Sequence, residues 1–144
     1  KNLNRMKKKS EVKAILYMRV GGTETDQSSK SIERQKRSLT DYCEKNGIKI
    51  LKAFEDTASG KNFNRDGWKE LLVFLSENKE SNIILLVTHF DRCTGNFLGA
   101  LQIVEMLNKV GIKLIEIETG KDITSVFKHN SIHFILSNVQ IKIK

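Results

Sequence analysis

The fold of this chain is organised around one stretch near its start: Ala14-Ile15-Leu16-Tyr17-Met18-Arg19-Val20-Gly21-Gly22-Thr23. It begins as an apolar and aromatic run, which is typical of a buried β-strand. It ends with an arginine, a valine and a pair of glycines. Ligands of open α/β sheets bind beyond the carboxyl ends of the strands. We therefore predict that this first strand delivers Arg19 and a loop to the floor of a functional site.

Apolar runs and amphipathic segments alternate along the rest of the chain. Strands are predicted at residues 12–20, 48–54, 82–88 and 112–117, and helices at residues 31–46, 67–78 and 96–110. The last of these helices is expected to turn four residues to the core, namely Leu98, Leu101, Val104 and Leu107. The order βαβαβαβ predicts a three-layer α/β domain, with a mostly parallel sheet of four to five strands and helices on both faces.

The two ends of the chain differ from this central pattern. Residues 1–12 are basic and polar and are expected to form a disordered lead, and residues 13–128 form the predicted domain. Residues 120–128 are expected to be a loop or a short edge strand. Residues 129–144 carry both helical and alternating apolar spacing, and we prefer a C-terminal helix.

Composition narrows the classes of function. The 144 residues carry a formal net charge of +8, which favours a polyanionic partner such as nucleic acid. The longest apolar run, residues 83–87, is too short to cross a membrane. Cys43 and Cys93 have no paired spacing, which favours reduced thiols and a cytoplasmic location. No glycine-rich nucleotide-binding motif occurs, and His129 and His133 lack further ligands nearby, so neither a cofactor nor a metal is expected.

Charged residues follow three of the predicted strands. Arg19 follows the first, Asp56 and then Arg65 follow the second, and Asp91 and Arg92 follow the third. Because the carboxyl ends of parallel strands meet at one edge of a sheet, these side chains can converge into a cationic pocket that the two carboxylates orient. Guanidinium groups bind phosphate through paired hydrogen bonds, so a phosphodiester is the natural ligand. Ordinary surface charges explain the same pattern equally well.

Five short motifs resemble the N-terminal catalytic domain of the serine recombinases, the family of resolvases, invertases and large serine integrases. They occur in the family's order across residues 13–119: Tyr17-Met18-Arg19-Val20, Ser31-Ile32-Glu33-Arg34-Gln35, Asp56-Thr57-Ala58-Ser59-Gly60, Asn64-Arg65-Asp66-Gly67 and Phe90-Asp91-Arg92. The resemblance implies a resolvase-like fold. It also implies that residues 129–144 begin a long helix that carries the dimer interface and leads toward a separate DNA-binding domain, so we expect base recognition to lie outside this chain.

The resemblance implies a chemistry as well. In the family, a serine directly after the Arg-Val of the first strand attacks the scissile phosphate of DNA and forms a 5′-phosphoserine. Arginines stabilise the transition state without a metal or cofactor, and the strands are exchanged within a tetramer. By resemblance, the catalytic positions are Arg19, Gly21 (the position of the serine), Gln35, Asp56, Arg65, Asp91 and Arg92, of which Arg19, Arg65 and Arg92 bind phosphate. The implied partners are DNA and a homodimer, a tetramer or a related recombinase, with roles in recombination and integration on mobile genetic elements.

Two departures from the family pattern bear on activity. Gly21 stands where the family has its serine, at the usual distance from Gln35, and Gly95 stands where a second arginine follows the Asp-Arg pair. Glycine carries no nucleophile, and the loss of an arginine that stabilises a phosphoryl-transfer transition state costs roughly 10³–10⁵ in rate. We therefore expect a recombinase domain with impaired catalysis.

Other interpretations stay open at this point. A non-catalytic module that keeps the fold and binds DNA or a recombinase partner is the main alternative, and a flavodoxin-like signalling or nucleotide-binding domain is a more distant one. Displaced hydroxyls are candidates for the nucleophile, namely Thr23, Ser28, Ser29 and Ser31. Cys93 is either a thiol activated by Arg92 or a small apolar residue in the core, and we favour the apolar role.

Overall fold

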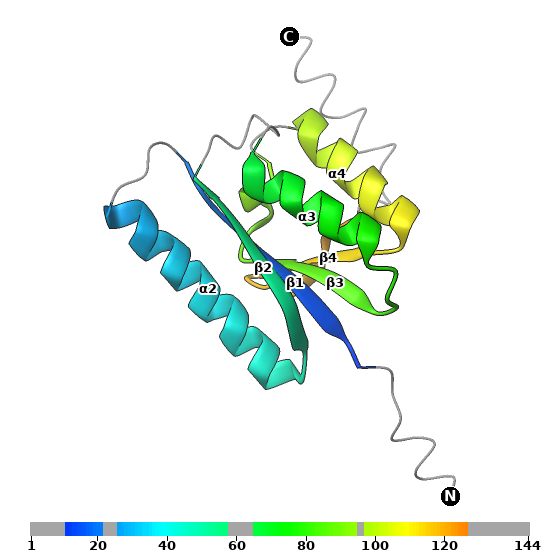
Figure 1. Ribbon diagram of the computed structural model, residues 1–144, viewed down its shortest axis with the longest axis horizontal. Helices are drawn as coiled ribbons and strands as arrows, with labels where there is room; N and C mark the ends of the chain where they lie inside the picture. Colours follow the sequence, from blue (N-terminus) through cyan, green and yellow to red (C-terminus); the bar gives the residue numbers. More distant parts are fainter. Residues whose placement is uncertain (1–10, 22–25, 58–64, 95–96, 127–144) are drawn as a thin grey trace, which may run out of the picture.

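A five-stranded sheet with the order β2-β1-β3-β4-β5 forms the centre of the molecule (Figure 1). The computed structural model describes residues 11–21, 26–57, 65–94 and 97–126, with only the backbone for residues 26–29 and 97. Its elements are β1 (Lys13–Val20), α2 (Asp26–Asn46), β2 (Lys49–Thr57), α3 (Asp66–Glu77), β3 (Ile83–Val87), η1 (Phe90–Arg92), α4 (Phe97–Val110), β4 (Lys113–Glu116) and β5 (Lys121–Asp122). The strands are parallel except for β5, which pairs antiparallel to β4.

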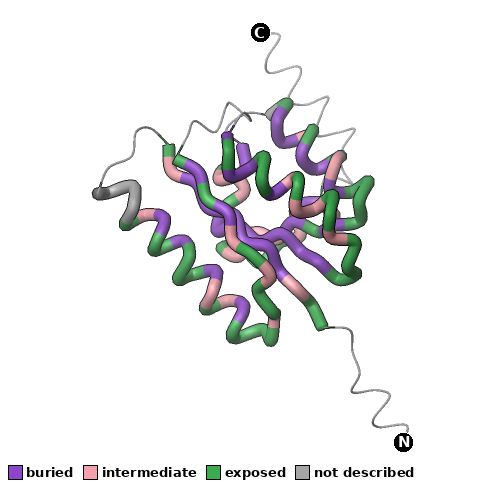
Figure 2. Tube along the Cα trace, viewed as in Figure 1, coloured by how far each residue is buried: buried purple, intermediate pink, exposed green. Residues whose placement is uncertain are grey.

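Helices cover both faces of the sheet, so the predicted three-layer α/β architecture is confirmed. Figure 1 shows α2 on one face and α3 with α4 on the other. Because successive side chains of a strand point to opposite faces, β1 serves both cores. Leu16 and Met18 pack in the cluster with Leu39 of α2, whereas Ile15 and Tyr17 pack in the cluster that contains α3 and α4. Figure 2 shows β1 and β3 as the buried centre of the fold, which explains their continuous apolar sequence.

Three predictions about the elements are wrong in detail. α2 begins at Asp26, before the predicted start at residue 31, because residues 26–30 contain no apolar side chain that would reveal a helical period. β2 extends to Thr57, so Asp56 lies within the strand and not after it. Leu98 is 64% exposed, and the core side of α4 is formed instead by Ile103, Val104 and Leu107, with Leu101 half-buried.

The remaining expectations divide into two groups. Of the two alternatives left open for residues 120–128, a loop or a short edge strand, the strand is present as β5. Residues 1–10 of the expected lead and the expected helix at 129–144 lie outside the described residues. Among the described helices, none combines the length and the apolar composition needed to span a membrane.

Candidate active site

The candidate site lies where β1 and β3 separate. Their ladder runs only from Lys13↔Ile83 to Leu16↔Leu86, whereas β1 stays paired with β2 as far as Val20↔Thr57. In this strand order the connections on either side of β1 and β3 run in opposite directions. Such a switch point is the usual position of a ligand site in an open α/β sheet.

Beside Arg19, where β1 no longer pairs with β3, the side chain of Gln35 from α2 supplies the hydrogen bonds to the main chain. The side-chain Oε1 accepts a hydrogen bond from the Arg19 main-chain N–H at 3.2 Å, and Nε2 donates to the Arg19 carbonyl at 3.1 Å. Both residues are buried. Because buried main-chain groups need partners, the Gln35 amide fixes the end of β1 and thereby the base of the Arg19 side chain.

The Arg19 side chain reaches across to η1. Its Nε donates to the carbonyl of Arg92 at 3.0 Å, and its Nη2 donates to the carbonyl of Asp91 at 2.8 Å. In return, Nη1 of Arg92 donates to the Arg19 carbonyl at 3.1 Å. Carbonyls at the end of a helical turn carry partial negative charge and attract cations. These reciprocal bonds hold the end of β1 and the segment after β3 together.

Arg65 joins the same segment from the start of α3. The residue is 3% exposed, and its Nη2 donates to the carbonyl of Cys93 at 2.6 Å. Its guanidinium carbon lies 5.5 Å from the centre of the Tyr17 ring and 5.7 Å from that of Trp68, within cation–π range. In this conformation Arg65 is buried, and it contributes positive charge to the site without being exposed to solvent.

The predicted convergence of the three arginines is therefore observed. The pKa of Arg19 is lowered from its ordinary value, first by burial and then by the positive charges of Arg65 and Arg92. Arginine remains protonated under such conditions. The three side chains, which we call the arginine pocket, therefore concentrate positive charge that an anion would stabilise. The Arg92 side chain is 30% exposed, which makes it the most accessible of the three to a ligand.

The two predicted acidic residues have different environments. Asp91 is exposed, and its Oδ1 lies 3.4 Å from Nε of Arg92. Asp56 is 9% exposed and accepts three hydrogen bonds, from the Tyr17 hydroxyl at 2.7 Å, the Gly67 N–H at 2.7 Å and the Trp68 N–H at 2.8 Å. Asp91 thus orients an arginine directly, whereas Asp56 fixes the first turn of α3.

Asp56 acts as a helix cap supplied from a neighbouring strand. The N-cap residue of α3 is Arg65, whose side chain makes no capping hydrogen bond. An arginine has no acceptor with which to cap a helix, so the carboxylate of Asp56 satisfies the first N–H groups in its place. Gly67 allows this close approach, since a Cβ there would lie 2.2 Å from the Glu55 carbonyl oxygen. Arg65 is positioned through this cap.

Gly21 is exposed directly after β1 and faces the arginine cluster. Among the atoms of the described residues, a Cβ built on Gly21 meets only Nη1 of Arg19 within 4 Å, at 3.8 Å, which is ordinary contact. The backbone of Gly21 is not among the left-handed positions that favour glycine. A side chain at position 21 would therefore fit beside Arg19 without strain.

The other candidate nucleophiles fall into different positions. Thr23, Gly95 and the side chains of Ser28 and Ser29 lie outside the described residues. Ser31 lines a small cavity that also includes Arg92. Cys93 is fully buried, and burial raises the pKa of its thiol to about 12. A protonated, buried thiol supports the apolar role for Cys93.

Sequence reasoning did not find several residues that build this site. Tyr17 and Gly67 were each within recognised motifs, but their link to Asp56 depends on the packing of α3 against β2.

Among the described residues, no group of three or more histidines, cysteines or carboxylates is arranged to hold a metal ion.

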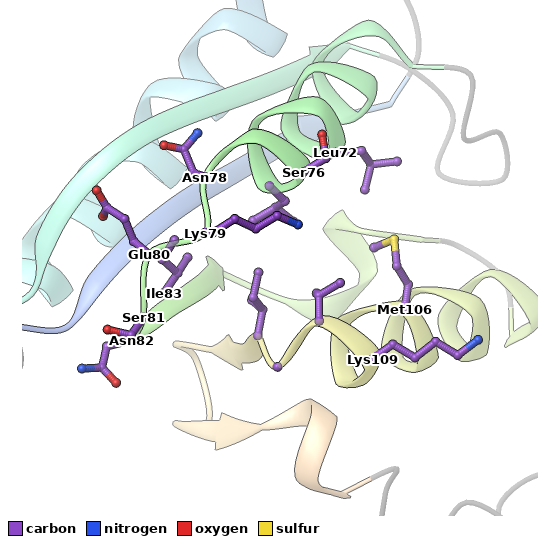
Figure 3. A pocket seen from close by; sticks show the side chains of 14 residues that line it. Leu72, Ser76, Asn78, Lys79, Glu80, Ser81, Asn82, Ile83, Met106 and Lys109 are labelled. Atoms are coloured by element: carbon purple, nitrogen blue, oxygen red, sulfur yellow. The ribbon is translucent and has the colours of Figure 1, made fainter.

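A larger cavity of about 730 Å³ lies at the other end of the sheet (Figure 3). Side chains from the end of α3, the turn before β3 and the end of α4 surround it, including Leu72, Lys79, Met106 and Lys109. It shares no lining residue with the arginine cluster. Cavity volume alone therefore does not identify the candidate site.

Comparison with known proteins agrees with the geometry. Residues 14–140 match the family described as Resolvase, N terminal domain. This chain belongs to that family. The C-terminal catalytic domain of ISC1926 TnpA, an IS607-like serine recombinase, is 28% identical, with a TM-score of 0.63 over 88% of this chain and 82% of that chain. The family match and this similarity identify a serine recombinase catalytic domain.

Two further solved structures show the same fold at lower identity. The N-terminal catalytic domain of TP901-1 integrase is 19% identical, with a TM-score of 0.71 over 92% of this chain and 98% of that chain. A resolvase family site-specific recombinase from Streptococcus pneumoniae is 21% identical, with a TM-score of 0.69 over 92% of this chain and 93% of that chain. The resolvase-like fold is thus confirmed.

Proposed function

We propose that this domain serves site-specific DNA recombination by binding a phosphodiester of DNA in its arginine pocket, but that it forms no phosphoserine intermediate. The observation that carries the proposal is the environment of Gly21. The position faces Arg19 with room for a side chain, yet glycine supplies no hydroxyl. The pocket is therefore built to hold a phosphate beside a position from which the attacking group is missing.

The charges of the pocket support binding to DNA. Burial lowers the pKa of Arg19, and the neighbouring charges of Arg65 and Arg92 lower it further, while the full chain carries a net charge of +8. Lysine and arginine contacts to phosphates release counterions and supply much of the affinity of proteins for DNA. In this proposal Arg92 contacts the phosphate, Arg19 fixes the segment that carries it, and Arg65 adds charge from below.

The catalytic impairment, the partners and the domain roles are parts of the same proposal. Without a nucleophile at position 21, the covalent route through that position is closed. We infer that residues 13–128 form the catalytic domain and residues 129–144 begin an interface helix, which pairs the chain as a homodimer or tetramer or with a related recombinase. In a mixed assembly, a chain without a nucleophile would still contribute phosphate binding and protein contacts.

Trapping of a covalent adduct tests the absence of a nucleophile. The unchanged chain and the Gly21→Ser variant are incubated with supercoiled plasmid DNA and examined for a protein–DNA adduct that survives denaturation. We expect no adduct from the unchanged chain and a slowly formed adduct from Gly21→Ser, because a serine fits beside Arg19 while Gly95 still stands where the family has a second arginine. An adduct from the unchanged chain would contradict the proposal and direct attention to Thr23, Ser28, Ser29 and Ser31.

A binding measurement tests the arginine pocket separately. Fluorescence anisotropy with a labelled duplex compares Arg92→Gln with Arg37→Gln, a matched loss of charge on the exposed side of α2. Arg92→Gln is expected to weaken binding and to reduce the salt slope by roughly one, whereas Arg37→Gln has a smaller effect. Equal effects of the two variants would show that net charge, and not the pocket, governs binding.

A further inference from the structure

A second, smaller cavity adjoins the candidate site on the α2 side of the sheet. Its volume is about 180 Å³, and it is lined by Ser31, Arg34, Gln35, Ser38, Thr88, His89 and Arg92. The first four residues belong to α2, and the last three follow β3. Gln35 and Arg92 line this cavity and also hold the Arg19 main chain. The cavity therefore borders the arginine pocket directly.

The hydroxyl of Thr88 lacks a hydrogen-bond partner within the described part of the chain. Thr88 is 8% exposed, and its Oγ1 is buried. Burial of a hydroxyl without a partner is costly, and such groups in native proteins call for an explanation. Because Thr88 lines the cavity, a ligand held there would supply the partner that the described residues do not.

The other lining groups select an anion. Arg34 and Arg92 bring two guanidinium groups, and Ser31 and Ser38 bring two more hydroxyls. Of the described residues that line the cavity, none is acidic. Two carboxylates pair with lining residues: Glu118 Oε2 lies 3.8 Å from His89 Nε2, and Asp91 Oδ1 lies 3.4 Å from Arg92 Nε. A third, Glu116, accepts a hydrogen bond from the Phe90 N–H. The volume is below the range of pockets for drug-sized ligands and suits a small oxyanion.

We propose that this cavity is a second phosphate subsite, in which Arg34, Arg92 and the Thr88 hydroxyl hold a phosphate group next to the one bound at the arginine pocket. The inference rests on the proposed function and extends it to a second phosphate of the same DNA strand. A free phosphate offers the same chemistry, so the experiment has one arm for each source.

The first arm measures inorganic phosphate binding to the full chain by ¹H–¹⁵N NMR. Saturable shifts are expected at the amides of residues 31–38 and 88–92. Thr88→Val and Arg34→Gln are each expected to lower phosphate affinity about fivefold or more, whereas the matched controls Thr40→Val and Arg37→Gln change it less than about twofold. An absence of saturable shifts, or equal affinity in Thr88→Val and the unchanged chain, overturns the subsite.

Thr88→Val also separates ligand binding from folding. Valine has nearly the shape of threonine and removes the unpartnered hydroxyl, so the melting temperature is expected to stay the same or rise while phosphate affinity falls. A lower melting temperature together with lost phosphate binding would assign Thr88 a structural role and overturn its role as a ligand.

The second arm measures a labelled DNA duplex by fluorescence anisotropy. Weaker duplex binding by Thr88→Val than by Thr40→Val supports a subsite for backbone phosphate. Loss of phosphate binding with unchanged duplex affinity assigns the cavity to a free anion and overturns the extension to DNA. An adduct from Gly21→Ser without saturable phosphate shifts shows failure of the subsite alone, whereas phosphate shifts without an adduct show failure of the proposed function, so the two failures are distinguishable.

Discussion

Replacement of Asp56 with asparagine tests whether this carboxylate holds the first turn of α3. Asp56 is 9% exposed, and both of its oxygens accept hydrogen bonds, Oδ1 from the Gly67 N–H and Oδ2 from the Trp68 N–H and the Tyr17 hydroxyl. Asparagine keeps one oxygen only. Whichever way the amide is turned, its NH₂ group faces a donor, and at least one buried N–H loses its acceptor.

The magnitude follows from these contacts. A buried donor left without a partner costs about 1–3 kcal/mol, and the loss of negative charge at a helix N-terminus costs about 0.3–1 kcal/mol more. We therefore expect Asp56→Asn to lower the free energy of unfolding by about 2–4 kcal/mol. Trp68 lies on the cap and is the single tryptophan of the chain, so its fluorescence during urea unfolding reports the change.

A matched control separates the loss of the cap from the loss of one negative charge. Asp91→Asn removes the same charge from a side chain that is 66% exposed and is expected to change stability by less than about 0.5 kcal/mol. If Asp56→Asn costs less than about 1 kcal/mol, or no more than Asp91→Asn, the capping role is refuted.

Three further predictions concern the same scaffold. Gly67→Ala should destabilise the domain by about 1–3 kcal/mol in urea unfolding, because a Cβ would lie 2.2 Å from the Glu55 carbonyl oxygen; unchanged stability would show that β2 and α3 separate freely. Cys93 should resist a thiol reagent at neutral pH until the chain is denatured, because burial raises its pKa to about 12, and rapid labelling of the native domain would contradict this. The pKa of Tyr17 is raised from 10.0 by burial and by its hydrogen bond to Asp56. The folded state thus keeps a proton that the unfolded chain releases, and stability should fall by up to about 1.4 kcal/mol per pH unit above pH 10, a slope that Tyr17→Phe should reduce.

The layers of the fold, and the edge of the sheet at which the site lies, follow from the pattern of the sequence alone. Two kinds of pattern indicate burial: the continuous apolar runs of β1 and β3, and the helical spacing of apolar residues around Trp68. Each pattern can be recognised within its own segment. The alternation of strands and helices requires a parallel sheet. Because parallel strands end at the same edge, the convergence of Arg19 and Arg92 was predictable from their places after two strands.

Which polar residues are buried, and what they contact, depends on how the segments pack together. The sequence places Asp56 in a loop. Its role as a cap appears only in the folded domain, where α3 packs against β2 and presents its N–H groups to the carboxylate. Thr88 becomes a buried hydroxyl facing a cavity only when α2 covers the end of β3. Leu98 fits the apolar stripe of α4, yet it is exposed, whereas Ala100 in the same turn of the helix is buried. Periodicity describes one segment at a time, whereas hydrogen-bond partners and burial depend on segments that are distant in the sequence.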